Sequence, residues 1–150
     1  MTTPASPYDL RLGQRSGTCS FRLMPTDELA AARSTLTVTE AATDRALALA
    51  YSWSHPEDGP QSGTLLLGVP AEDGVVSAAW VDSWHQRDVV LLTGSSAATT
   101  VTVGYEYAPG WSWEIEVGGG DTTTLVMRNA VPERESAPAV TYDVMRASWT

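Results

Sequence analysis

The sequence predicts an all-β fold, a single antiparallel up-and-down β-barrel of about ten strands. Short runs rich in Val, Thr, Leu, Trp and Tyr recur from residue 16 onward, and Gly, Pro, Asp or Asn bounds each run. Sequences such as PAEDG, APG and GGGD join the runs, which favours hairpins between consecutive strands. An open sheet would leave two exposed edges, so we expect closure into a barrel, with a two-sheet sandwich as the alternative.

The expected elements follow one another along the whole chain. Residues 1–10 are polar and contain two prolines, which predicts a flexible N-terminal arm before a single domain at 11–150. The sequence PTDELAAAR predicts at most one short helix near residues 26–33, because Thr26 can cap it and two acidic residues follow. The expected strands cover residues 16–23, 35–41, 45–54, 62–69, 74–84, 87–94, 98–107, 111–117, 122–129 and 138–149.

Strict alternation shows which side chains share a face in several of these strands. In RALALAYSW, large residues that include Tyr51 and Trp53 alternate with alanine and serine. In GWSWEIEV, Trp111 and Trp113 point one way and two glutamates the other, and TTVTVGYEY repeats the pattern with Tyr105. A period of two is typical of a strand with one face on a core. We therefore expect these five aromatic residues to face inward.

Composition excludes several classes of function. The chain of 150 residues has a net charge of −9, with nine arginines and no lysine, so it has no basic patch for nucleic acid. The lone Cys19 cannot form an intramolecular disulfide, and no Cys/His spacing resembles a zinc site. No leader-like N-terminus and no run of about 18 apolar residues is present, so we expect a cytoplasmic protein without a membrane partner.

The stretch WVDSWH combines two tryptophans, a carboxylate, a hydroxyl and a histidine. Alternation places Trp80, Asp82 and Trp84 on one face and Ser83 and His85 on the other. A catalytic triad needs its members within about 3 Å of one another, which nearly consecutive residues of one strand cannot achieve. We therefore expect no catalytic residues here, and we interpret His85 as a strand-end residue at a hairpin turn.

Asp82 has the strongest claim to burial among the acidic residues, because Trp80 and Trp84 flank it on the same face. A buried carboxylate must be paired or hydrogen-bonded. Arg146 and Arg15 are the candidate partners. Such a pair would either latch the barrel shut or, with a bound molecule present, orient its polar end.

The middle of the chain, GTLLLGVPAEDGVVSAAWVDSWHQRDVVLLTG, resembles a bacterial calycin-like family of unknown function. Its members show a strand ending in Gly, an acidic turn, a strand closing on W-[VI]-D-S, and a further strand ending in Gly. The matching features are Gly68, Glu72-Asp73-Gly74, Trp80-Val81-Asp82-Ser83 and Gly94. The resemblance covers residues 12–149 and implies a lipocalin-like β-barrel, although Arg15 replaces the tryptophan of the family's opening G-x-W-x-G.

The resemblance also bears on cofactors. Some similar ten-stranded calycin barrels bind haem through a histidine near the C-terminus, and residues 86–150 contain no histidine. Haem also needs a buried axial ligand, for which only His55 and His85 are available. We therefore expect no cofactor.

The predicted function is binding of a small apolar or amphipathic ligand in the barrel interior. Tryptophan and tyrosine combine a wide apolar face with one polar group, which suits such a cavity. The alternative is an interaction module with a packed core, as a homodimer through the strand that holds Trp111 and Trp113; an enzyme acting on a small lipophilic substrate comes third. The candidate ligand-binding residues are Tyr51, Trp53, Trp80, Asp82, Trp84, Tyr105, Trp111, Trp113 and Arg146.

Overall fold

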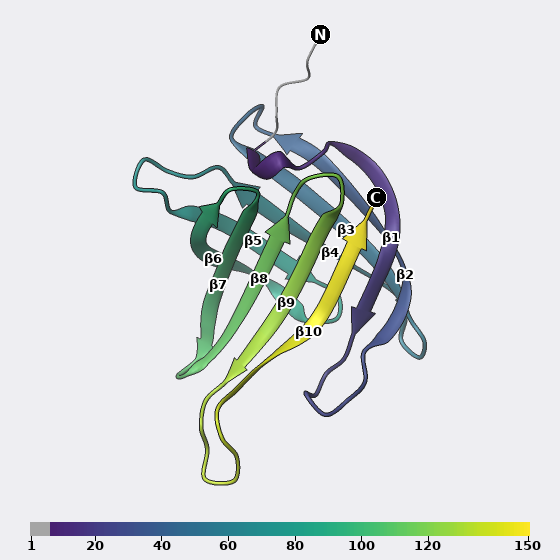
Figure 1. The fold of residues 1–150 in the computed structure, drawn as a ribbon, viewed down its shortest axis with the longest axis vertical. Helices are drawn as coiled ribbons and strands as arrows, with labels where there is room; N and C mark the ends of the chain where they lie inside the picture. Colours follow the sequence, from purple (N-terminus) through teal and green to yellow (C-terminus); the bar gives the residue numbers. More distant parts are fainter. Residues whose placement is uncertain (1–6) are drawn as a thin grey trace.

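Ten antiparallel strands close into one barrel in the computed structural model, which describes residues 7–150 (Figure 1). The strands are β1 (Gly13–Phe21), β2 (Ala30–Ala41), β3 (Ala46–His55), β4 (Gly59–Gly68), β5 (Val76–Asp82), β6 (Gln86–Ala97), β7 (Thr100–Ala108), β8 (Trp111–Gly118), β9 (Thr123–Val131) and β10 (Val140–Trp149). Each strand pairs with its neighbour in sequence, and β1 also pairs with β10. Closure satisfies both edges of the sheet, and the predicted fold class is confirmed.

No helix forms near residues 26–33, which agrees with the prediction of at most one short helix there. Residues 24–27 form a turn in which the Asp27 amide donates to the Met24 carbonyl at 3.1 Å. Residues 30–33 already belong to β2 and pair with β1. Two turns of helix are marginal alone, whereas β1 offers this segment a continuous ladder of backbone hydrogen bonds. Within the described chain, no helix is long and apolar enough to cross a membrane.

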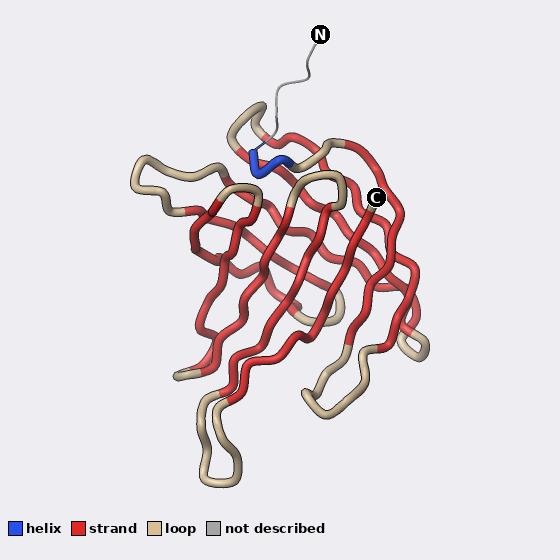
Figure 2. Tube along the Cα trace, in the orientation of Figure 1, coloured by secondary structure: helices blue, strands red, loops and turns tan. Residues whose placement is uncertain are grey.

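The segment before β1 packs across one end of the barrel as a short 3-10 turn, η1 (Pro7–Asp9), drawn in blue in Figure 2. The Tyr8 hydroxyl donates to the Gly68 carbonyl at 2.7 Å, and the side chains of Tyr8 and Leu10 are buried. The flexibility of an arm at residues 1–10 stays a prediction. Residues 1–6, which complete that prediction, lie outside the described part of the chain.

The inward-facing residues that strand alternation predicts form the buried core of the barrel. In β3 the four large side chains of one face are buried, and the alanine and serine residues between them are more exposed. Polar groups are rare in this core. In the described part of the chain only Ser34, Asp82 and Thr123 are both polar and fully buried, and Asp82 alone of the three is ionisable.

The burial of the inward-facing side chains of β7 and β8 decreases toward the hairpin that joins these strands. Val103 and Ile115 are buried, whereas Tyr105 and Trp113, one inward position closer to the hairpin that joins the strands, are partly exposed. The connection between β9 and β10 extends beyond the barrel at this same end, opposite η1 (Figure 1). We call it the aromatic end, because large rings gather there.

Candidate functional site

The turn between β5 and β6 brings Asp82 and His85 together at the aromatic end. The ladder between the two strands shifts register between Trp80 and Asp82, and residues 83–85 form the turn. Oδ1 of Asp82 accepts hydrogen bonds from the backbone amides of Trp84 (2.7 Å) and His85 (2.9 Å), a common way for Asp to fix a turn. The turn carries the His85 side chain back toward Asp82. The predicted placement of these residues on opposite faces is therefore wrong.

The second oxygen of Asp82 joins the carboxylate to two further side chains. Oδ2 accepts a hydrogen bond from the Tyr51 hydroxyl at 2.5 Å and lies 3.0 Å from Nδ1 of His85. The Trp80 indole in turn donates to the Tyr51 oxygen at 2.9 Å. The side chains of Asp82 and His85 are 0% and 2% exposed. The partner of the buried carboxylate is thus a histidine.

The arginines expected beside Asp82 lie elsewhere, so the predicted Asp–Arg latch is wrong. Arg146 is 56% exposed, and its Nε donates to Asp143 at 2.6 Å. It lies between two buried residues of β10 and therefore points outward. Arg15 donates to the Arg11 carbonyl at 2.7 Å.

The ionised carboxylate of Asp82 determines which ring nitrogen holds the proton when His85 is neutral. Burial opposes ionisation of this carboxyl, but hydrogen bonds from His85 and Tyr51, the charge of His85 and the Trp84 amide outweigh it and lower the pKa. An ionised carboxylate only accepts hydrogen bonds, so Nδ1 must donate to it. In neutral His85 the lone pair is then on Nε2.

Aromatic rings surround the imidazole. The centroid of the His85 ring lies 4.8 Å from that of Trp84, 5.6 Å from Trp113 and 5.7 Å from Trp53. Trp80 is 6.5 Å from His85 and stacks on Trp113 at 5.6 Å. We call this group the aromatic cluster; it consists of Tyr51, Trp53, Trp80, Asp82, Trp84, His85 and Trp113.

Three buried polar atoms of the aromatic cluster have no hydrogen-bond partner among residues 7–150. They are Nε2 of His85 and the indole nitrogens of Trp53 and Trp113. Each is a strong hydrogen-bonding group, and burial without a partner costs about 1–3 kcal/mol. The other buried polar atoms of the cluster are bonded, as the contacts of Asp82 show. The unpartnered atoms therefore mark the part of this cluster that can bind a polar group.

Most of the predicted site residues meet in the aromatic cluster, and three do not. Tyr105 lies at its rim, where the hydroxyl donates to Gln86 at 2.7 Å. Trp111 packs instead against the guanidinium of Arg134, 5.3 Å from the ring centroid. Arg146 is on the outer surface. The predicted residues that the structure does bring together are Tyr51, Trp53, Trp80, Asp82, Trp84 and Trp113.

Sequence reasoning missed two contributors, His85 and Phe21. The Phe21 ring lies 5.7 Å from the ring of Trp84 and 6.5 Å from that of Trp53. The sequence does contain a pattern that indicates the position of His85. An aspartate at the end of a strand can bond the amides two and three residues later, and that turn redirects the third residue. Nothing local in the sequence indicates the role of Phe21.

Neither Cys19 nor Ser83 is suited to act as a nucleophile that His85 activates. Burial and the nearby Asp82 charge raise the pKa of the Cys19 thiol to about 12, so it stays protonated at neutral pH. Ser83 is exposed, and its hydroxyl donates to Gln61 at 2.7 Å. Neither Cys19 nor Ser83 therefore supplies a nucleophile that His85 could activate.

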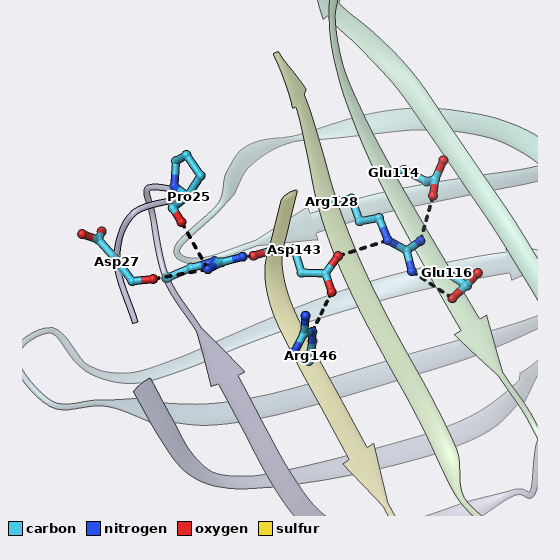
Figure 3. Close-up of polar contacts among 8 residues, drawn as sticks. Pro25, Asp27, Glu114, Glu116, Arg128, Asp143 and Arg146 are labelled. Atoms are coloured by element: carbon cyan, nitrogen blue, oxygen red, sulfur yellow. Dashed lines mark hydrogen bonds and ion pairs between the residues drawn. The ribbon is translucent and has the colours of Figure 1, made fainter. Parts of the chain in front are cut away.

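A second charged cluster lies on the outer face of β8, β9 and β10 (Figure 3). Arg128 donates to Glu114 (2.9 Å), Glu116 (3.2 Å) and Asp143 (3.1 Å). Asp143 also accepts from Arg146, as described above. We call these five residues the outer network. All of them are at least partly exposed and all have partners, so this cluster ties strands together and offers no free buried group.

The fold and the cluster define a closed antiparallel barrel with a buried carboxylate–histidine pair at its aromatic end. No family model matches the sequence, and no curated protein matches it significantly. Among solved structures, that of Rv2717c from M. tuberculosis is similar, with a TM-score of 0.60. The two share 14% sequence identity over 92% of this chain and 90% of that chain. At this identity the similarity shows a shared fold.

Proposed function

We propose that the protein binds a small, mostly apolar molecule at the aromatic end of the barrel. A polar group of this molecule would meet Nε2 of His85 and the indole N–H groups of Trp53 and Trp113. The observation that supports the proposal is the presence of three unpartnered buried polar atoms in one cluster. Buried polar groups are normally bonded, and exceptions call for an explanation.

Other tryptophans of the chain differ from Trp53 and Trp113 because their indole N–H groups have hydrogen-bond partners. The indole of Trp149 donates to Ser34 at 2.9 Å, and that of Trp84 donates to Asp58 at 3.0 Å. The chain therefore supplies partners for indoles elsewhere, and the two unpartnered ones flank His85. The burial of Trp80 and Asp82 also supports the calycin-like resemblance of the W-V-D-S segment, which we retain as part of this proposal.

A ligand titration tests the proposal. Fatty acids, retinoid-like and haem-like compounds and naphthalene derivatives would be added while tryptophan fluorescence and thermal unfolding are recorded. A ligand that binds only the folded state stabilises it by about 2.7 kcal/mol at a concentration of 100 times Kd. We expect Trp53→Phe to weaken binding and Trp149→Phe, whose indole is already bonded, to leave it unchanged. A panel without any quench or thermal shift would contradict the proposal.

A homodimer is the second candidate, through a different surface from the one expected. Trp113 stacks on Trp80, so we propose a more exposed apolar surface for this contact. On the outer face, Leu66 and Leu91 lie opposite the same residue of β5 and are 41% and 75% exposed. Two copies could cover this row by a two-fold contact. Sedimentation of the wild type and of Leu91→Arg decides, because a monomer at all concentrations ends this alternative.

A further inference from the structure

The unpartnered atoms of the aromatic cluster specify the hydrogen-bonding character of the group they would bind. Nδ1 of His85 donates a hydrogen bond to Asp82, so Nε2 accepts a hydrogen bond whenever the imidazole is neutral. The indole nitrogens of Trp53 and Trp113 can only donate. A single ligand group that meets all three atoms must have one proton to give and lone pairs to offer, which describes a hydroxyl.

The charge of the site argues for a neutral partner. The carboxylate of Asp82 is 0% exposed and lies one imidazole ring away from Nε2. A second anion in these apolar surroundings would lose its hydration and be repelled by that charge. An ammonium group has no lone pair for the two indole donors. Carboxylates and ammonium groups are both disfavoured.

The walls of the cluster favour a flat ring. Trp53 stacks on His85 with an interplanar angle of 29°, and Trp80 stacks on Trp113 at 15°. Because these faces already cover one another, a ligand ring would meet the stacked pairs at their edges, in the edge-to-face arrangement that aromatic rings also favour. We propose that the ligand is a neutral phenol, whose O–H donates to His85 and whose oxygen accepts from the indoles. This inference rests on the proposed function and names the ligand class for the same site.

Three compounds with one ring system test the inference on the unmodified protein. They are 2-naphthol, 2-methoxynaphthalene and 2-naphthoate, and calorimetry measures their affinities. The ether keeps the oxygen acceptor and loses the proton, which leaves Nε2 of His85 unsatisfied. We expect 2-naphthol to bind about tenfold more tightly than the ether, and the carboxylate to bind more weakly than 2-naphthol. In ¹⁵N NMR spectra, 2-naphthol should move the Nε2 resonance of His85 and the ether should not.

Variants of the aromatic cluster test whether its residues cause the preference for 2-naphthol over the ether. His85→Phe should bring the affinities of 2-naphthol and the ether to within about twofold of each other, because neither can then donate to residue 85. Trp113→Phe should weaken both compounds, because both use their oxygen as an acceptor. Trp149→Phe is the matched control, and thermal unfolding establishes that each variant folds. If His85→Phe does not fold, the comparison of ligands on the unmodified protein decides.

The outcomes separate this inference from the proposed function. Equal affinities for 2-naphthol and its ether, or tightest binding by 2-naphthoate, overturn the phenol class while ligand binding stands. The same holds if fatty acids or retinoid-like compounds bind and none of the three naphthalenes does. If no compound of the whole panel binds, the proposed function itself fails.

Discussion

The aromatic cluster and the outer network both join acidic and basic side chains across strands, yet their surroundings differ. In the outer network Arg128 bonds three carboxylates, and its partners are open to water, with Glu114 47% exposed. Inside the barrel Asp82 and His85 are almost fully buried. Water screens the first set and leaves each pair worth little, whereas the second must be fully bonded or become costly. The outer network therefore adds little stability pair by pair, whereas Asp82 and His85 are stabilising only while they keep each other as partners.

The largest effect should follow removal of the inner carboxylate. Asp82→Ala leaves the Tyr51 hydroxyl, Nδ1 of His85 and two turn amides without their acceptor. Breaking a buried charged pair costs about 3–5 kcal/mol, and we expect a loss of this size in the free energy of unfolding from urea titration. Asp143→Ala in the outer network is the control, with an expected loss of about 1 kcal/mol. Equal losses would show that burial does not separate the two clusters.

The next largest effect should come from Gly63, the cross-strand neighbour of Tyr51, which leaves room for the Tyr51 ring. A Cβ atom at residue 63 would overlap the Tyr51 ring and hydroxyl, so Gly63→Ala must displace the group that donates to Asp82. Overpacking of this kind costs about 1–3 kcal/mol. The exposed Thr64→Ala change in the same strand should stay within about 0.5 kcal/mol. Denaturant titration compares the two, and equal stabilities would mean that the ring has room to shift.

Acid should weaken the inner cluster in a defined direction. The folded state lowers the pKa of Asp82 below its ordinary value, so the unfolded chain binds the proton first as the pH falls. The resulting stability is present above about pH 4 and is lost as the pH falls through the folded pKa. The stability difference between wild type and Asp82→Asn should therefore shrink below about pH 4. A difference that stays constant to pH 2 would contradict an ionised Asp82.

The inward residues of the site could be predicted from the sequence because strand alternation is a local property. Tyr51 and Trp53 share a face through their spacing alone, and so do Trp80 and Asp82. Closure of the barrel then brings these inner faces together without further information. Alternation also places Trp111 inward, but it cannot say how close a residue lies to the open end of a barrel.

The partner of Asp82 could not be predicted in the same way. The period of two ends at the register shift after Trp80, and the turn built on the Asp82 side chain redirects His85. A second register shift in β10 buries two consecutive residues and leaves Arg146 outside. Both depend on how strands pair, which spacing along one strand does not contain. Residues 30–33 join β2 for a related reason, since pairing with β1 outweighs their weak helical preference.

The smallest effect should come from the outer network, in the variant Arg128→Met. Methionine keeps the apolar stem of the side chain and removes the charge that three carboxylates share. We expect a loss of about 0.5–1 kcal/mol in low salt, because the pairs are partly exposed and the carboxylates are left to repel one another. Since about 1 M salt shortens the screening length to about 3 Å, most of this loss should vanish there. The loss from Asp82→Ala should persist in salt, because buried groups are screened much less. A loss in Arg128→Met that does not change with salt would mean that the Arg128 charge behaves as a buried one. That result would contradict the 27% exposure of its side chain.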